Sequence, residues 1–192
     1  MIERRAAVAG LLRDAGDLLV VSGLGSTTYD AAAAGDRALN FYLWGAMGGA
    51  AMIGLGLALA QPGRRVLVLT GDGEMLMGMG ALATIAAQAP ANLAIAVLDN
   101  GRFGETGGQA SHTALGTDLA AVARGCGWPA VASVAEADEL DALRLRLRRE
   151  LLFAVVRIAP EDAPRFLPPR DGVLLAHRFR AALLGAADHP GC

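Results

Sequence analysis

Long runs of apolar residues recur along this sequence, separated by segments with helical character. The clearest runs are "RRVLVLTG" at 64–71, "NLAIAVLDN" at 92–100 and "LLFAVVRIAP" at 151–160. A strand that is apolar at consecutive positions, rather than at alternate ones, is buried on both of its faces. Strands of this kind that alternate with helices are typical of a parallel sheet covered on both sides. The sequence therefore predicts an α/β fold: a single three-layer α/β/α domain with a mainly parallel, doubly wound sheet.

The remaining segments continue this alternation. Shorter strands are expected at "DLLVVSG", near "ALNFY" and around "PAVASV". Helices are expected over residues 2–15, 26–34, 46–60, 75–89, 136–150 and 173–185, and the stretch from 101 to 113 is expected to be irregular. A chain of 192 residues is long enough for one sizeable core and short for two. We therefore predict one domain over residues 1–192, in which 161–192 form a C-terminal connection and a last helix.

Composition excludes several classes of function. All 17 basic residues are arginine, so the chain has no lysine for a P-loop or for a Schiff base. The formal net charge of −2 shows none of the basic excess that marks nucleic-acid binding. The two cysteines, Cys126 and Cys192, form no CxxC or metal-ligand pattern, which favours a reduced, cytoplasmic protein.

One segment has the length of a membrane span. Residues 41–60, "FYLWGAMGGAAMIGLGLALA", are twenty residues without a charge. Five of them are glycine, however, and "QPGRR" leads directly from this segment into the next predicted strand. A glycine-rich helix is also expected where a backbone packs closely on a sheet or approaches a ligand. We therefore expect a buried helix in a protein that does not enter the membrane.

Small polar residues follow three of the predicted strands, and ligands of open parallel sheets bind beyond such strand ends. The three segments are "SGLGSTTYD", "GDGE" and "DNGRFGETGGQASHT". The first supplies Gly23 and Gly25 of a dinucleotide-binding GxGxxG pattern, but Thr28 stands where the third glycine is needed. A nucleotide-binding module is therefore the weaker alternative.

Asp72 stands between Gly71 and Gly73, at the end of a predicted strand and the start of a helix. An aspartate at this place can simply cap the helix. The flanking glycines also let backbone N–H groups approach a large anion such as a phosphate. A carboxylate tolerates a neighbouring phosphate when a cation joins them, and Mg²⁺ prefers oxygen ligands. Asn100, at the end of the next predicted strand, supplies a further oxygen, so the pattern predicts a Mg²⁺–phosphate site.

The stretch "GDGEMLMGMGALATIAAQAPANLAIAVLDNGRFGETGG" resembles the cofactor motif of thiamine-diphosphate-dependent enzymes, in which GDG and a terminal Asn enclose a helix and a strand. The Asn-Asn pair common in that family is Asp99-Asn100 here. The resemblance implies thiamine diphosphate and Mg²⁺ as cofactors. It also implies that the metal is held by side-chain oxygens of Asp72 and Asn100 and by the backbone carbonyl of Arg102.

Other positions are similar to the diphosphate-binding, C-terminal-type domain of the same family. The resemblance assigns the backbone N–H groups of Gly73 and Glu74 to the diphosphate. It makes Met47 the apolar wedge that bends the cofactor, and the Gly45 carbonyl the acceptor for its 4′-amino group. Ordinary core packing is the alternative for Met47.

The "ETGGQ" and "SHT" stretches resemble the β subunits of sulfopyruvate and phosphonopyruvate decarboxylases, where such a loop closes over the cofactor. With Met47, the candidate catalytic residues are Glu105, for proton transfer, and His112, for contact with an anionic substrate. A loop histidine without a role is an equal alternative for His112. Ser26 and Thr27 are candidate diphosphate contacts or, equally, helix caps. The residues expected at the cofactor are Ser26, Thr27, Gly45, Met47, Gly71, Asp72, Gly73, Glu74, Asn100, Arg102, Phe103, Gly104, Glu105 and Thr106.

The expected single domain leaves no room for the pyrimidine-binding half of such an enzyme, whose glutamate activates the cofactor. The resemblance thus implies a separate α subunit that carries this Glu, in an α₂β₂ or larger assembly that contains a homodimer of this chain. It implies a lyase that decarboxylates a small anionic 2-oxo acid to CO₂ and an aldehyde. Carboligation to acetolactate-like products and oxidation of a 2-oxo acid stay open as alternatives.

Overall fold

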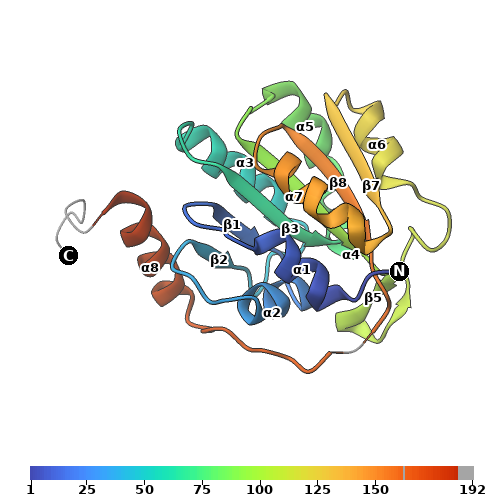
Figure 1. Cartoon of the computed structure of the whole chain (residues 1–192), viewed down its shortest axis with the longest axis horizontal. Coiled ribbons are helices and arrows are strands. Elements are labelled where there is room, and N and C mark those ends of the chain that lie inside the picture. The colour runs from blue at the N-terminus through green and yellow to red at the C-terminus, as the bar shows by residue number, and fades with distance from the viewer. Residues whose placement is uncertain (162, 186–192) are drawn as a thin grey trace.

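The computed structural model describes residues 1–161 and 163–185 (Figure 1). Its centre is a six-stranded sheet made of β1 (Leu19–Ser22), β2 (Asn40–Tyr42), β3 (Val66–Gly71), β4 (Leu93–Asp99), β7 (Ala130–Val134) and β8 (Leu152–Arg157). The strand order is β2-β1-β3-β4-β8-β7, and each pair of neighbours runs parallel. The predicted α/β class with a parallel, doubly wound sheet is confirmed. Cys192 and parts of the predicted C-terminal segment, residues 162 and 186–192, lie outside the described residues.

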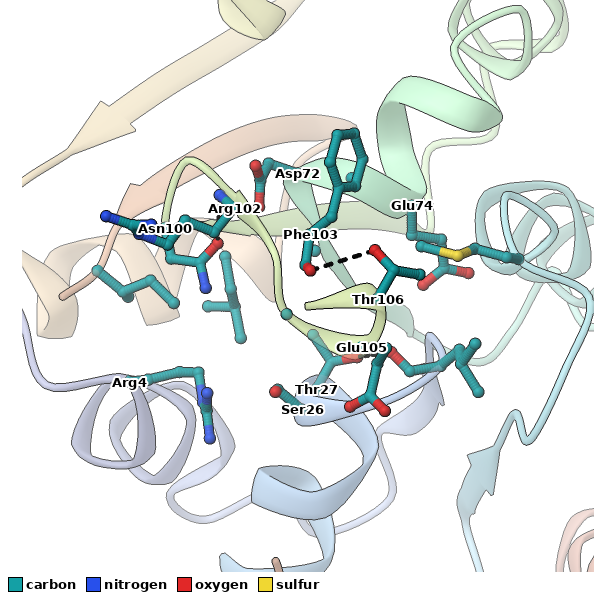
Figure 2. Close-up of a pocket in the computed structure, with 17 residues that line it drawn as sticks. Arg4, Ser26, Thr27, Asp72, Glu74, Asn100, Arg102, Phe103, Glu105 and Thr106 are labelled. Carbon is teal, nitrogen blue, oxygen red and sulfur yellow. Dashed lines mark hydrogen bonds between the residues drawn. The ribbon is translucent and has the colours of Figure 1, made fainter. Parts of the chain in front are cut away.

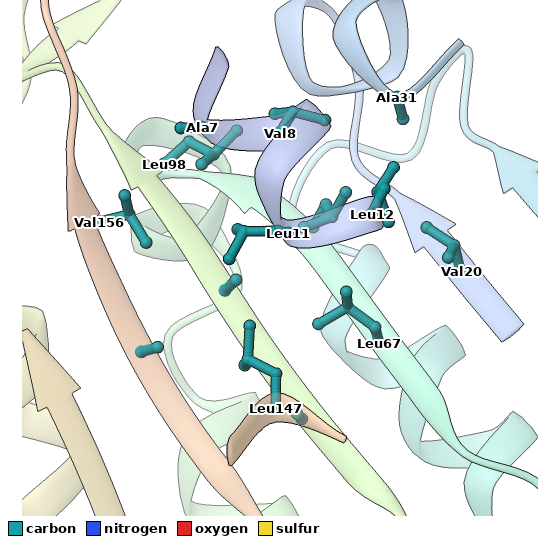
Figure 3. Close-up of a cluster of buried hydrophobic side chains, with 14 of the residues drawn as sticks. Ala7, Val8, Leu11, Leu12, Val20, Ala31, Leu67, Leu98, Leu147 and Val156 are labelled. Carbon is teal, nitrogen blue, oxygen red and sulfur yellow. The ribbon is translucent and has the colours of Figure 1, made fainter. Parts of the chain in front are cut away.

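Helices cover both faces of the sheet. One face carries α1 (Arg4–Leu12), α2 (Ser26–Ala33) and α7 (Leu140–Leu147), and the other carries α3 (Ala50–Ala60), α4 (Asp72–Met77), α5 (Ala81–Gln88) and α6 (Leu119–Gly125). Alternate strand residues point to opposite faces. Leu67 and Leu69 of β3 therefore pack with the first layer, shown in Figure 3 around Leu11 of α1, and Val66 and Val68 pack with the second. Burial on both faces explains why these strands are apolar without alternation.

The strand order reverses between β1 and β3. The chain leaves β1 through α2 to reach β2 on one side, while β3 continues through α4 and α5 to β4 on the other. In open α/β sheets the ligand crevice lies at such a switch point, beyond the carboxyl ends of the strands. After β4, a small antiparallel hairpin of β5 (Arg102–Phe103) and β6 (Gln109–Ala110) replaces the irregular stretch expected from the sequence.

The predicted helices all differ from the observed ones at one or both ends, and for two of them the backbone shows the reason. The helix expected over 46–60 begins at Ala50, because Ala46 and Gly48 have positive φ angles of 55° and 89° and form a turn. The helix expected over 75–89 is divided into α4 and α5. At the break, a Cβ on Gly78 would lie 2.2 Å from the Gly48 carbonyl oxygen. This close backbone contact holds the turn before α3 against the end of α4.

The glycine-rich segment of the sequence forms α3, an 11-residue helix that lies on the sheet. Gly54 is in close contact with β3, since a Cβ at this position would lie 2.2 Å from Val68 Cγ2. Close packing on the sheet therefore explains this glycine. The described part of the chain contains no helix that is both long enough and apolar enough to cross a membrane.

After β8 the chain runs in an extended path past α2, and α8 (Gly172–Leu184) then packs beside β2 (Figure 1). Trp44 Nε1 donates a hydrogen bond to the carbonyl oxygen of Pro169 at 2.9 Å, which fixes the end of this path. The rings of Phe41 and Phe179 meet edge to face, with centroids 5.5 Å apart, and fix α8.

Candidate functional site

The loops that follow β1, β3 and β4 converge on a cavity of about 70 Å³ at the switch point of the sheet (Figure 2). Every residue predicted at the cofactor lines this cavity except Gly45, and the predicted metal ligands Asp72, Asn100 and Arg102 are among them. The full lining is Arg4, Leu24, Ser26, Thr27, Met47, Gly71, Asp72, Gly73, Glu74, Leu98, Asn100, Arg102, Phe103, Gly104, Glu105, Thr106 and Ile158. Parallel topology brings these segments together because it places the three strand ends side by side.

Asp72 is the first residue of α4 and is 2% exposed. Its Oδ2 accepts hydrogen bonds from the hydroxyls of Ser111 and Thr113, the latter at 3.2 Å. Burial raises the pKa of the Asp72 carboxyl, the neighbouring Asp99 carboxylate raises it further, and the two hydroxyls act in the opposite direction. A carboxylate whose charged form is disfavoured by burial is stabilised by a bound cation.

A second buried carboxylate, that of Asp99, stands at the end of β4. Its Oδ1 accepts hydrogen bonds from Thr113 Oγ1 at 2.7 Å and from Gly101 N at 3.0 Å, and its Oδ2 pairs with Arg157 at 2.9 Å. Within the described residues, the pair with Arg157 is the only ion pair that Asp72 or Asp99 makes. Of these two buried carboxylates, only Asp99 pairs with a cationic side chain among the described residues. A bound divalent ion would compensate the negative charge of Asp72.

Asp72 and Asn100 leave the sheet at the same edge. Gly71 of β3 pairs with Leu98 of β4, so Asp72 comes level with Asp99 and Asn100 follows one residue beyond. Asn100 Oδ1 accepts a hydrogen bond from Arg102 N at 2.9 Å, which turns the chain into the hairpin. The described residues contain no group of three or more His, Cys, Asp or Glu side chains that could hold a metal. A carboxylate, an amide and a backbone carbonyl nevertheless form an oxygen donor set that fits Mg²⁺ once phosphate oxygens join it.

The side chain of Glu74 is turned into the protein and is 3% exposed, whereas the sequence suggests a role only for its backbone N–H. Its Oε2 accepts a hydrogen bond from Thr70 Oγ1 at 3.1 Å, and its Oε1 has no hydrogen-bond partner among the described residues. Burial raises the pKa of this carboxyl, while the Thr70 hydroxyl and, to a smaller extent, the nearby backbone of Ala50, Gly48 and Leu24 oppose that shift. The Glu74 carboxylate thus lies between the loops that follow β1 and β2.

Met47 lines the cavity from the turn between β2 and α3. The residues on either side of it, Ala46 and Gly48, both have positive φ angles, so this turn has a specific and uncommon backbone conformation. Gly45 is exposed on the same turn and lies outside the cavity lining. The Gly45 carbonyl can therefore contact a ligand only if that ligand extends beyond the cavity.

The loop after Asn100 folds back over the cavity. A Cβ on Gly73 would lie 2.6 Å from the Phe103 ring, and a Cβ on Gly25 would lie 2.7 Å from Glu105 Cγ. Phe103 and Glu105 of this loop thus lie directly against the two glycines, and a diphosphate bound at the Gly73 backbone would have to share this space with Phe103.

Ser26 and Thr27 begin α2 below this loop. Thr27 Oγ1 donates a hydrogen bond to Gly23 O at 2.7 Å, so its hydroxyl serves the start of the helix. Ser26 lines both the central cavity and an adjoining cavity of about 530 Å³, which Arg4 and Arg102 also line. Of the two hydroxyl residues, Ser26 is the better placed to contact a ligand.

His112 does not line the central cavity. It is exposed and borders a separate cavity of about 300 Å³, together with Phe103. The two rings meet edge to face with centroids 6.1 Å apart, and Phe103 lines both cavities. A catalytic role of His112 therefore requires a ligand that reaches past Phe103.

The residues that hold Asp72 in place are not evident from the sequence. Ser111 and Thr113 belong to "SHT", a stretch whose small hydroxyl residues give no sign of burial, yet they are 0% and 7% exposed. Arg4 lines the cavity as well, and its burial depends on an ion pair with Asp30 in α2. Both cases depend on contacts between distant segments, which no local pattern indicates.

Comparison with known proteins agrees with this geometry. The family model described as "Thiamine pyrophosphate enzyme, C-terminal TPP binding domain" matches residues 23–158. A sulfopyruvate decarboxylase subunit beta of Methanothermobacter thermautotrophicus is 37% identical over 188 residues, which cover 98% of this chain and 99% of that protein. A phosphonopyruvate decarboxylase of Streptomyces viridochromogenes is 42% identical over 172 residues, which cover 86% of this chain and 42% of that protein. The chain thus spans less than half the length of the second relative.

Among solved structures, a 2-oxoglutarate:ferredoxin oxidoreductase from Magnetococcus marinus superposes with a TM-score of 0.68 at 18% identity, covering 91% of this chain and 66% of that one. At this identity the likeness shows the fold alone. The family match, in contrast, covers more than half of this chain and includes the segments that follow β1, β3 and β4. The chain therefore belongs to the thiamine pyrophosphate enzyme family, as its C-terminal TPP-binding domain.

Proposed function

We propose that this chain is the diphosphate-binding subunit of a two-subunit, thiamine-diphosphate-dependent 2-oxo-acid decarboxylase, a lyase that releases CO₂ and an aldehyde. The observation that carries this proposal is the placement of Asp72 and Asn100 at adjacent strand ends in one cavity. The match to a sulfopyruvate decarboxylase subunit beta over nearly all of both chains, and to part of a phosphonopyruvate decarboxylase, favours a small anionic 2-oxo acid as the substrate. We further propose that residues 1–192 act as one domain.

In this proposal Asp72 would hold a Mg²⁺ ion that neutralises charge at the diphosphate. Ser111 and Thr113 bond to Asp72 Oδ2, so Oδ1 is the oxygen left for the metal. The side-chain oxygen of Asn100 and the backbone carbonyl of Arg102 would be the other ligands from this chain. The buried negative charge of Asp72 and Asp99, with only Arg157 opposite it among the described residues, supports a cation at this place.

Thiamine diphosphate, when bound, supplies the electron sink that decarboxylation of a 2-oxo acid needs. The residues of this chain bind and shape it. The backbone N–H groups of Gly73 and Glu74, in the first turn of α4, would bind the diphosphate. In the same proposal, Met47, which lines the cavity, and the Gly45 carbonyl, on the same turn, would set its bent shape. The loop at 103–106, which lines the cavity, would exclude water from the bound cofactor.

A separate α subunit completes the site in this proposal. It carries the pyrimidine-binding half and the catalytic Glu, in an α₂β₂ or larger assembly that contains a homodimer of this chain. Exposed apolar side chains support a covered surface here: Met77 and Met79, beside the cavity that His112 borders, are 64% and 38% exposed. Glu105 stays a candidate for proton transfer and His112 for substrate contact. The proposed location, the cytoplasm, rests on the cysteine pattern.

The experiment that tests this function is to isolate the chain with the subunit that co-purifies with it and to assay the complex on sulfopyruvate, phosphonopyruvate and pyruvate. The expected result is release of CO₂ and an aldehyde that depends on thiamine diphosphate, on Mg²⁺ and on both subunits. Acetolactate-like products would indicate a carboligase instead, and electron transfer to an acceptor would indicate a 2-oxo-acid oxidoreductase. Saturation of the chain by NAD, without Mg²⁺-dependent binding of thiamine diphosphate, would contradict the proposal and favour a nucleotide-binding module.

A further inference from the structure

We propose that Asp99, Thr113 and Ser111 form a positioning network, which holds the Asp72 carboxylate in its metal-binding orientation and anchors the neighbouring hairpin loop. None of these three residues lines the central cavity, so they act through Asp72. The inference rests on the proposed function for the identity of the metal, whereas the network itself consists of contacts within this chain.

The network joins two strand ends through one returning loop. Thr113 Oγ1 lies 2.7 Å from Asp99 Oδ1 and 3.2 Å from Asp72 Oδ2. Ser111 Oγ also bonds to Asp72 Oδ2 and lies 2.9 Å from Thr113 Oγ1. All four residues are buried. Water cannot easily replace hydrogen bonds at this depth, so removal of one hydroxyl leaves a buried carboxylate without its partner.

Thr113 has one hydroxyl proton and faces two carboxylate oxygens. Asp99 Oδ1 at 2.7 Å is the nearer acceptor and Asp72 Oδ2 at 3.2 Å is the farther one, so the Thr113 hydroxyl is shared unequally between them. Ser111, held by Thr113 at 2.9 Å, is the second donor to Asp72. Two hydroxyls only partly offset the charge of two buried carboxylates, so a cation on Asp72 and the ordered network would stabilise each other.

Asp99 is held from two other directions. Its Oδ1 also accepts a hydrogen bond from Gly101 N, and its Oδ2 pairs with Arg157 of β8, whose side chain is half exposed. An asparagine at position 99 would keep an oxygen that accepts from Thr113 and Gly101, and it would lose only the pair with Arg157. The accepting oxygen is therefore the essential feature of Asp99 for the network, and the charge is secondary.

The same contacts fix the base of the loop. The hairpin of β5 and β6 ends at Ala110, one residue before Ser111. Ser111 N donates to Gly101 O at 2.8 Å and closes the base, while the Ser111 and Thr113 side chains tie it to the two strand ends. Phe103, the last residue of β5, lies over the cavity on the hairpin that this base anchors. The network thus connects the metal ligand to the loop that covers the cofactor.

Amide hydrogen exchange of the full 192-residue chain without metal tests the anchoring. Thr113→Val removes the hydroxyl and keeps the shape of the side chain, whereas Thr113→Ser keeps a hydroxyl. Thr84→Val, at an exposed position of α5, is the matched control.

We expect Thr113→Val to speed amide exchange in residues 101–113 about tenfold, as for loss of a hydrogen bond to a charged group. Thr113→Ser and Thr84→Val should exchange like the wild type. Unchanged exchange in Thr113→Val would overturn the anchoring. If Thr113→Val does not fold, Ser111→Ala removes the other hydroxyl and is judged in the same way.

A titration of the chain, in complex with its co-purifying subunit, with Mn²⁺ in the presence of thiamine diphosphate tests the positioning when it is followed by electron paramagnetic resonance. We expect Thr113→Val and Asp99→Ala to weaken Mn²⁺ binding about tenfold. Thr113→Ser and Asp99→Asn should retain most of the wild-type affinity for Mn²⁺. Equal affinity in the wild type, Thr113→Val and Asp99→Ala would overturn the positioning role. Absence of Mn²⁺ binding in the wild type would instead contradict the proposed function, and the exchange result would still decide whether the network anchors the loop.

Discussion

Gly23 lies directly against the carboxylate of Glu74: a Cβ at position 23 would fall 1.6 Å from Glu74 Oε2. Gly23 follows β1, whereas Glu74 lies in the first turn of α4 after β3. The same Oε2 accepts a hydrogen bond from Thr70 of β3, so the carboxylate is fixed between two neighbouring strand ends. Close approach is therefore the reason for a glycine at position 23.

Gly23→Ala is expected to destabilise the protein through this contact. The added methyl group forces the buried Glu74 carboxylate away from Thr70, and we expect the free energy of unfolding to fall by roughly 1–3 kcal/mol. In a Glu74→Ala background the methyl group has space, so the cost of Gly23→Ala should shrink. Urea unfolding of the four proteins of this double-mutant cycle measures the coupling. Equal costs in both backgrounds would show that Gly23 does not accommodate Glu74.

Two glycines of α3 provide a matched pair of substitutions. A Cβ on Gly54 would lie 2.2 Å from Val68 Cγ2, whereas a Cβ on the exposed Gly56 would meet nothing within 4 Å. Gly54→Ala should lower the free energy of unfolding by roughly 1–3 kcal/mol through overpacking. Gly56→Ala should raise it by roughly 0.5–1 kcal/mol, because alanine favours the helix. Chemical denaturation of both variants checks this, and equal effects of the two would contradict the packing of α3 on β3.

Asp72→Asn is expected to separate stability from metal binding. Burial and the nearby Asp99 raise the pKa of Asp72, so without metal its charge costs stability near neutral pH. The neutral amide removes that cost, so we expect the variant to have a higher free energy of unfolding than the wild type in chelator. Thermal unfolding with chelator and then with Mg²⁺ and thiamine diphosphate tests this. The wild type should gain stability from the cofactors and the variant should not; an equal gain in both would exclude Asp72 as a metal ligand.

The buried hydroxyl of Tyr42 is expected to make the folded protein less stable at high pH. This hydroxyl donates to Asp36 Oδ1 and accepts from Asn40 Nδ2, both at 3.0 Å, and burial raises the pKa of Tyr42 to about 12. An unfolded tyrosine loses its proton near pH 10. The stability that Tyr42 contributes is therefore complete below about pH 10 and is lost as the pH rises toward about 12.

Comparison of the wild type with Tyr42→Phe isolates this contribution. Urea unfolding at about pH 8 and at about pH 11 should show a larger loss of stability in the wild type than in the variant. If both proteins lose the same stability, the hydroxyl of Tyr42 is not the group that titrates.

The sheet and the proximity of Asp72 to Asn100 are predictable because they depend on local features of the sequence. β3 and β4 are apolar at consecutive positions because helices cover both of their faces. Asp72 and Asn100 directly follow these two strands, and parallel neighbours end at the same edge. Strand periodicity and strand order are thus sufficient to bring the two residues together.

The remaining features depend on contacts between distant segments. The break between α4 and α5 results from the contact of Gly78 with Gly48, which no helix pattern contains. In the sequence, Asp99 is visible only as a replacement of the first Asn in the family's Asn-Asn pair. Its role cannot be predicted there, because its partners Thr113 and Arg157 lie on other segments. The position of Phe103 on Gly73 likewise requires the hairpin, which is too short to produce a strand signal.

The position of Mn²⁺ bound with thiamine diphosphate is the most direct test of the proposed site. Crystals of the chain with its co-purifying subunit, grown with both, allow the metal to be located from its anomalous signal. We predict a metal peak between Asp72 and Asn100, about 2 Å from an oxygen of each side chain, with Phe103 moved off Gly73. A cofactor whose metal contacts neither Asp72 nor Asn100 would contradict the site on which the proposed function depends.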